Sequence, residues 1–131
     1  MADNYDQNDI RTIMERVAMA FIALRDGSNS PSDFNTLAMA MNMGAIRAEA
    51  IGQAEFDVFD NAKQALLDAD ALYDTMRIYT FTQGALIDLA KGVQGYSELL
   101  ATSTPEQMEA CGKESQRRLA AGQVAKHGSV H

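Results

Sequence analysis

Apolar side chains recur every three or four residues along most of this chain, which is the spacing of one face of an α-helix. The pattern is interrupted where glycine, proline, serine or a short β-branched run falls between the periodic segments. The periodic segments predict five helices, at about residues 8–26, 30–50, 53–77, 82–101 and 104–121. Since they cover almost the whole sequence, we expect an all-α fold, a compact bundle of about five helices.

The second and third predicted helices differ in how their apolar residues are distributed. The second carries two apolar stripes, and a helix that is apolar on most of its circumference belongs in the middle of a bundle. The third keeps one apolar stripe from Phe56 to Met76, with charged side chains on the remaining surface. At about 1.5 Å per residue it would be about 35 Å long. We therefore expect the second helix to be central and the third to be long and amphipathic.

Capping residues mark where the last two helices begin. Thr82 is a candidate N-cap for the fourth helix. Thr104 is expected to be the N-cap of the fifth, with Pro105 at the first helical position and Gln107 completing a capping box. The start of the fifth helix therefore has the strongest local signal in the chain.

The length and composition of the chain fit one small helical domain. Its 131 residues correspond to a single domain, and an apolar fraction of 47% supplies material for a core. The eight methionines, many alanines and absence of tryptophan favour helices over strands. We predict a single helical-bundle domain over residues 1–122 and a flexible C-terminal tail over residues 123–131.

The net charge of −7 limits the kinds of molecule that we expect the protein to bind. A negatively charged surface repels the phosphates of nucleic acids and anionic membranes, so we expect neither to bind directly. No apolar run reaches the roughly 20 residues that a membrane-spanning helix needs. The acidic N-terminus differs from the basic start of a signal peptide, and a single cysteine cannot form an internal disulfide. We therefore expect a cytoplasmic protein.

No arrangement of residues in the sequence is typical of catalysis or of a cofactor site. Both histidines, His127 and His131, lie in the predicted tail without the cysteine or Glu-x-x-His partners of zinc and di-metal sites. Cys111 lies among apolar residues of the last helix, where a small buried side chain is expected. The glycines match neither the P-loop nor the dinucleotide-binding fingerprint. We predict a protein that is not an enzyme, with no catalytic residue, no metal site and no cofactor.

Acidic side chains concentrate on the third predicted helix. These acidic residues are Glu55, Asp57, Asp60, Asp68, Asp70 and Asp74. The only basic residues nearby in the sequence are Lys63 within the helix and Arg77 at its end. Such a face is either simply solvated or binds a partner that carries basic residues. In the extended or looped run 78–82 that follows, Tyr79 and Phe81 could equally be core residues or part of an exposed patch. We take the six acidic residues together with Tyr79 and Phe81 as the candidate partner-binding surface.

From Asp33 onward the chain resembles a known group of sequences. The similar segments are FNTLAMAMN at 34–42, AEAIG at 48–52, AKQAL at 62–66, LAT at 100–102 and RRLAAGQV at 117–124. By these segments the chain resembles a group of small uncharacterised helical proteins of proteobacterial prophages and other mobile elements. It departs from them at 78–84, where those proteins often have a tryptophan-containing turn with Asp-Gly.

The resemblance implies an accessory protein of a mobile element, acting in a bacterial host cell. Small non-enzymatic proteins of such elements often block or redirect host machinery, for example by inhibiting a defence complex such as a CRISPR effector. The acidic helix would then pair with a basic surface on a host protein or protein complex. The alternative is a homo-oligomeric structural or regulatory protein that uses a Met-rich surface of the second helix, with Met39, Met43 and Ile46 exposed in the monomer.

Overall fold

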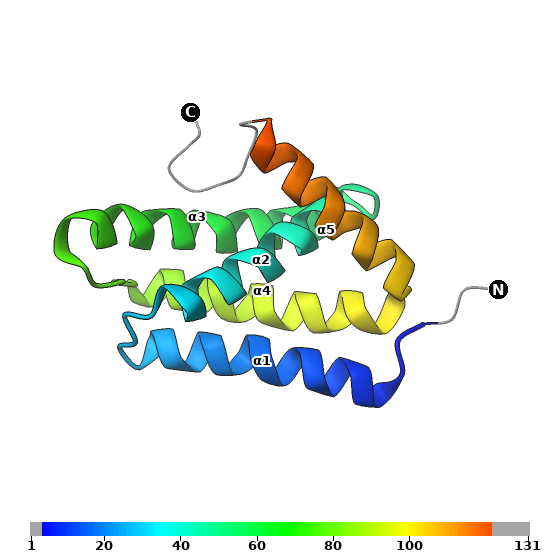
Figure 1. Ribbon diagram of the computed structural model, residues 1–131, viewed down its shortest axis with the longest axis horizontal. Helices are drawn as coiled ribbons and strands as arrows, with labels where there is room; N and C mark the ends of the chain where they lie inside the picture. The colour runs from blue at the N-terminus through cyan, green and yellow to red at the C-terminus, as the bar shows by residue number, and fades with distance from the viewer. Residues whose placement is uncertain (1–3, 122–131) are drawn as a thin grey trace.

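The computed structural model describes residues 4–121, which form five α-helices joined by short connections (Figure 1). The helices are α1 (Gln7–Arg25), α2 (Pro31–Glu49), α3 (Gln53–Met76), α4 (Gln83–Thr102) and α5 (Pro105–Ala120). No strand occurs within residues 4–121. The predicted all-α bundle of five helices is therefore confirmed. The predicted tail at 123–131 lies outside the described residues.

Polar side chains fix the start of four of the five helices. The first backbone N–H groups of a helix have no partner within it, and a capping oxygen satisfies one of them. Asp6 caps α1 and Ser30 caps α2 in this way, while Thr82 accepts the Ala85 N–H at 3.0 Å. At α5, Thr104 and Gln107 each accept the other's backbone N–H, so the predicted capping box is confirmed.

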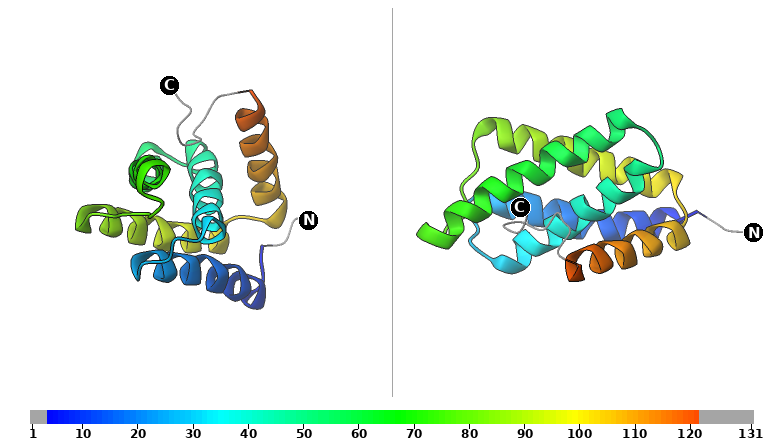
Figure 2. Two further views of the ribbon diagram at one scale, coloured as in Figure 1. Left: turned by 60° about the vertical axis from the view of Figure 1, so that its left-hand side comes forward. Right: turned by 90° about the horizontal axis from the view of Figure 1, so that it is seen from above.

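The second helix is the centre of the bundle. α2 packs against each of the other four helices, and α3 and α1 also pack against α4. Figure 2 shows α2 with α3, α4, α1 and α5 arranged around it. Its side chains at Leu37 and Met41 are fully buried. The central position predicted from the two apolar stripes of α2 is confirmed.

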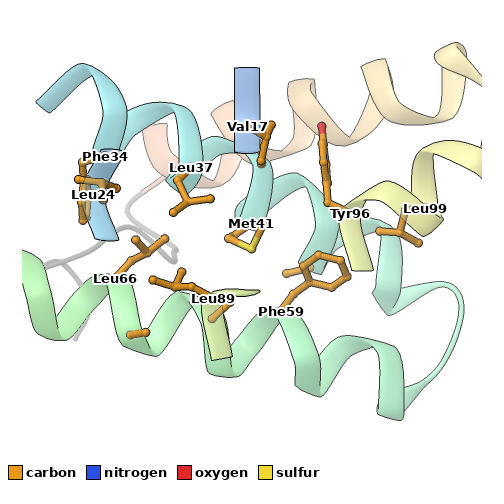
Figure 3. Close-up of a cluster of buried hydrophobic side chains, with 14 of the residues drawn as sticks. Val17, Leu24, Phe34, Leu37, Met41, Phe59, Leu66, Leu89, Tyr96 and Leu99 are labelled. Carbon is orange, nitrogen blue, oxygen red and sulfur yellow. The ribbon is translucent and has the colours of Figure 1, made fainter. Parts of the chain in front are cut away.

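A close fit between small and large residues sets the position of α3. Phe59 is 2% exposed, and its ring points into the core (Figure 3). A Cβ atom added at Gly44 of α2 would lie 2.6 Å from Cδ1 of Phe59, and one added at Gly95 of α4 would lie 3.2 Å from its Cζ. Interiors packed at this density leave no room for an extra methyl group without movement. The two glycines thus form the space that Phe59 fills and hold α3 against α2 and α4.

Polar contacts attach α5 to the C-terminal part of α2. The Arg118 guanidinium donates to both carboxylate oxygens of Glu49 on α2 at 2.8 Å, and its Nε donates to Glu114 at 2.7 Å. Near the start of α5, Arg47 Nε donates to the hydroxyl of Ser103, which is fully buried. Bidentate charge-assisted pairs of this kind are stronger than neutral hydrogen bonds. Arg118 therefore joins α5 to α2, two helices that are distant in sequence.

The Arg118 contacts predict how stability changes with acidity. Hydrogen bonds from Arg117 and Arg118 lower the pKa of Glu114 to about 2, and hydrogen bonds from Arg118 lower the pKa of Glu49. A carboxylate whose pKa is lowered by folding stabilises the protein above its unfolded pKa of about 4.5, and this is lost as pH falls toward the folded value. We expect Arg118→Gln to reduce the fall in melting temperature between about pH 5 and about pH 2.

The control for this measurement is Arg25→Gln. Arg25 forms an exposed pair with its neighbour Asp26 at the end of α1 and makes no contact between helices. We expect this variant to lose stability on acidification as the unaltered protein does. An Arg118→Gln profile parallel to that of the unaltered protein would show that the pair with Glu49 does not contribute to α5 docking.

Candidate functional site

The carboxylates predicted as a binding surface all lie on α3, and Asp57, Asp60 and Asp68 are on the side that faces away from the core. Glu55, Asp57, Asp60, Asp68 and Asp74 are exposed, and Asp70 is half-buried. The opposite side of the helix is buried and carries Phe59, Ala62, Ala65, Leu66 and Ala69. We call Glu55, Asp57, Asp60, Asp68, Asp70 and Asp74 the acidic face. The structure thus places on one helix all six acidic residues of the candidate surface.

The acidic face forms a broad band around α3. At about 100° per residue, Asp57, Asp60 and Asp68 lie within roughly 80° of one another on the outermost side. Asp70 and Asp74 lie further round and widen the band to roughly 160°, and Glu55 at the start of the helix extends it to roughly 220°. Between Asp57 and Asp74 the helix rises by about 26 Å. Carboxylates arranged in this way suit a partner surface that curves around the helix.

The three outermost carboxylates form no salt bridge within residues 4–121. Gln53 Nε2 donates to Asp57 at 2.7 Å, and Gln64 Nε2 donates to Asp68 at 2.9 Å. Within residues 4–121 the salt bridges pair Arg25, Arg117 and Arg118 with Asp26, Glu49 and Glu114, none of which lies on α3. Asp57, Asp60 and Asp68 are exposed to solvent, which makes them available to basic groups on a partner.

The one basic residue within α3, Lys63, lies one turn after Asp60 on the neighbouring surface of the helix. Lys63 lines a cleft of about 230 Å³ between α2, α3 and α5, together with Glu49 and Arg118. Burial lowers the pKa of the Lys63 ammonium, and Asp60 and Glu49 act against this shift. Because Arg118 is already paired with Glu49, the cleft holds a structural ion-pair network and not a set of groups ready for proton transfer.

The aromatic part of the candidate surface is only partly accessible. Tyr79 is 8% exposed, and its ring stacks between Phe34 at 4.6 Å and Tyr73 at 4.2 Å, measured between ring centroids. Phe81 is half-buried and packs against the same core. The Tyr79 ring therefore closes one end of the core between α2 and α3 and leaves little of its surface for a partner.

The second helix has an accessible apolar residue. Met39 is 58% exposed, whereas Met43 and Ile46 are half-buried. The alternative based on a Met-rich surface requires these residues to be accessible, and Met39 meets that requirement. The sequence did not show that α1 and α5 stand on either side of this residue, because helix docking is not encoded in local spacing.

Groups for metal binding or nucleophilic chemistry do not come together in the part of the chain described here. Residues 4–121 contain no cluster of three or more His, Cys, Asp or Glu that could hold a metal ion. Cys111 is buried, and burial raises the pKa of its thiol, so it is a weak nucleophile. His127 and His131 lie outside the described residues. Over the same range, no helix has the length and apolar character needed to cross a membrane.

Comparison with known proteins does not assign the chain to a family. No protein-family model matches it, and neither a curated protein nor a solved structure matches it. The resemblance to proteins of mobile elements therefore stays a prediction from the sequence. The function has to be inferred from the surface of the bundle.

Proposed function

We propose that the protein is a non-enzymatic protein-binding accessory factor of a phage or mobile element, which binds a basic partner through the acidic face of α3. The observation that carries this proposal is the set of exposed carboxylates on one helix, of which the three outermost form no salt bridge within residues 4–121. Complementary charge speeds the encounter of two proteins and selects among partners.

The packing of the buried side of α3 holds the acidic face in a fixed position, which suits it for recognition. Phe59, Ala62 and Ala69 on the buried side of α3 are at most 2% exposed and hold the helix in place. The carboxylates of Asp57, Asp60 and Asp68 are therefore presented at fixed spacing before a partner arrives. A surface that is already ordered loses less conformational entropy on binding, so more of the interaction energy appears as affinity.

The chemistry of the acidic face indicates the class of partner. A row of carboxylates can occupy a groove lined with Lys and Arg that otherwise holds nucleic-acid phosphates. Together with the resemblance to mobile-element proteins, this points to an inhibitor of a nucleic-acid-handling host complex, for example a CRISPR effector. The net charge of −7 disfavours direct binding to the nucleic acid itself.

The experiment that tests this proposal is capture from a bacterial host lysate on the immobilised protein. Bound proteins are eluted by a step to high salt and identified by mass spectrometry. We expect a basic protein or complex that handles nucleic acid in the salt eluate, because exposed charge pairs weaken as salt rises. Recovery of the protein alone, or only of proteins that resist the salt step, would contradict binding through the acidic face.

A further inference from the structure

The cleft that Lys63 lines is built from three helices, and we call it the Lys63 cleft. Four residues of α2 line it at spacings of three and four, and Figure 2 shows α3 and α5 on different sides of that helix. Its volume of about 230 Å³ is that of about seven or eight water molecules, so only a small molecule fits. Its lining includes one polar side chain from each helix that is not part of the ion-pair network, and these are Asn42, Lys63 and Ser115.

These three side chains have hydrogen-bonding capacity that the described part of the chain leaves unused. Lys63 is half-buried, yet within residues 4–121 it forms neither a salt bridge nor a hydrogen bond. Over the same range the side chains of Asn42 and Ser115 form no hydrogen bond. Because polar groups away from bulk water are nearly always hydrogen-bonded, three such groups facing one small space indicate a ligand.

Ser115 is the most deeply buried of the three, at 9% exposed. Thr36 and Thr102 each donate to the carbonyl oxygen four residues earlier at 3.0 Å, which is a common contact of a hydroxyl within a helix. Within residues 4–121 Ser115 forms no such bond. No polar side-chain atom in that range is both fully enclosed and without a partner, so a small molecule can reach the Ser115 hydroxyl.

The charges around the Lys63 cleft favour a ligand with a single negative charge. The neighbouring ion pairs neutralise one another, and they consist of Glu49, Glu114, Arg117 and Arg118. Asp60, on the same helix as Lys63, is exposed and forms no salt bridge with it. The Lys63 ammonium therefore remains to attract an anion, while the Glu49 carboxylate that also lines the cleft disfavours an anion with two charges.

The rest of the lining is apolar and includes Ile46 and Phe56, which are both half-buried. We propose that the Lys63 cleft binds a small aliphatic monocarboxylate, whose carboxylate oxygens accept hydrogen bonds from Lys63, Asn42 and Ser115. The aliphatic part of the ligand lies against Ile46 and Phe56. Hydrogen bonds between an ammonium and a carboxylate are roughly twice as strong as neutral ones, so Lys63 supplies the largest share of the affinity.

The test is isothermal titration calorimetry of the full chain with sodium butyrate, sodium acetate and inorganic phosphate at low ionic strength. We expect butyrate to bind about tenfold more tightly than acetate, because two further methylene groups leave water. Phosphate should bind more weakly than butyrate, because its second charge is repelled by Glu49. Absence of butyrate binding would overturn the proposal. So would tighter binding of phosphate, which would show a site for multiply charged anions.

Two variants and a matched control place the binding in the cleft. Lys63→Gln should weaken butyrate binding at least about tenfold, and Ser115→Ala about three- to tenfold. Lys91→Gln changes the net charge by the same amount at an exposed position of α4 and should bind butyrate as the unaltered protein does. The circular dichroism spectrum of each variant should keep its helical form. Full affinity in both cleft variants would overturn the proposal, and so would an equal loss in Lys91→Gln.

Discussion

Replacing Phe59 by alanine is expected to lower the free energy of unfolding by about 3–5 kcal/mol. The side chain is 2% exposed and fills the space that Gly44 and Gly95 leave between α2, α3 and α4. Removal of the ring forfeits its transfer free energy and leaves a cavity where three helices meet. Chemical denaturation followed by circular dichroism measures the loss. A cost below about 1 kcal/mol would show that the three helices do not depend on this contact.

The contact between Phe59 and Gly44 can also be tested by replacing the glycine. Gly44→Ala should destabilise the protein by about 1–3 kcal/mol although alanine is the better helix former, because the new methyl group would overlap the Phe59 ring. Gly84→Ala is the matched control: it lies in the first turn of α4, where an added Cβ would approach nothing closer than 4.0 Å. This variant should be unchanged or more stable by up to about 1 kcal/mol. Equal gains from both substitutions would contradict close packing at Gly44.

Reversing the charge of the outermost carboxylates is expected to abolish capture of the host partner. The variant carries Asp57→Lys, Asp60→Lys and Asp68→Lys, all at exposed positions of α3. Each substitution replaces an attraction to the basic surface by a repulsion, and like charges brought together at an interface cost several kcal/mol. Because the buried side of α3 is unchanged, the circular dichroism spectrum should keep its helical form. Capture of the same partner at full yield would contradict a role for these three residues.

A matched control separates local charge from total charge. The substitutions Asp9→Lys, Glu15→Lys and Glu109→Lys change the net charge by the same amount at exposed positions on α1 and α5. We expect this variant to capture the partner, with a slower association because the overall field is weaker. Loss of capture in both variants would mean that net charge, and not the acidic face, drives binding.

The helices could be predicted from the sequence because the signals that define them are local. The apolar spacing of α3 persists over its whole length, and Thr104 with Gln107 fixes the start of α5 within a few residues. The position of α5 could not be predicted in this way. It depends on Arg118 reaching Glu49, which is distant in sequence, and the buried side of α5 does not itself specify which helix it packs against.

The burial of Tyr79 shows a signal that sequence reasoning could have used. In the connection between α3 and α4, Ile78, Thr80 and Thr82 are exposed, while Tyr79 is buried and Phe81 is half-buried. This is the two-residue alternation of an extended segment with one side against a core. From composition alone, Tyr79 and Phe81 could each be a core residue or part of an exposed patch. The pattern of burial within the segment assigns both to the core side.

The measurement that tests the central claim most directly is the affinity of the unaltered protein for its captured partner as salt rises from about 50 to about 500 mM. Binding through the acidic face predicts a steep loss of affinity, because the charges of Asp57, Asp60 and Asp68 lie at the surface and are screened by added ions. An affinity that stays constant over this range would contradict the claim and would place the contact on an uncharged surface of the bundle.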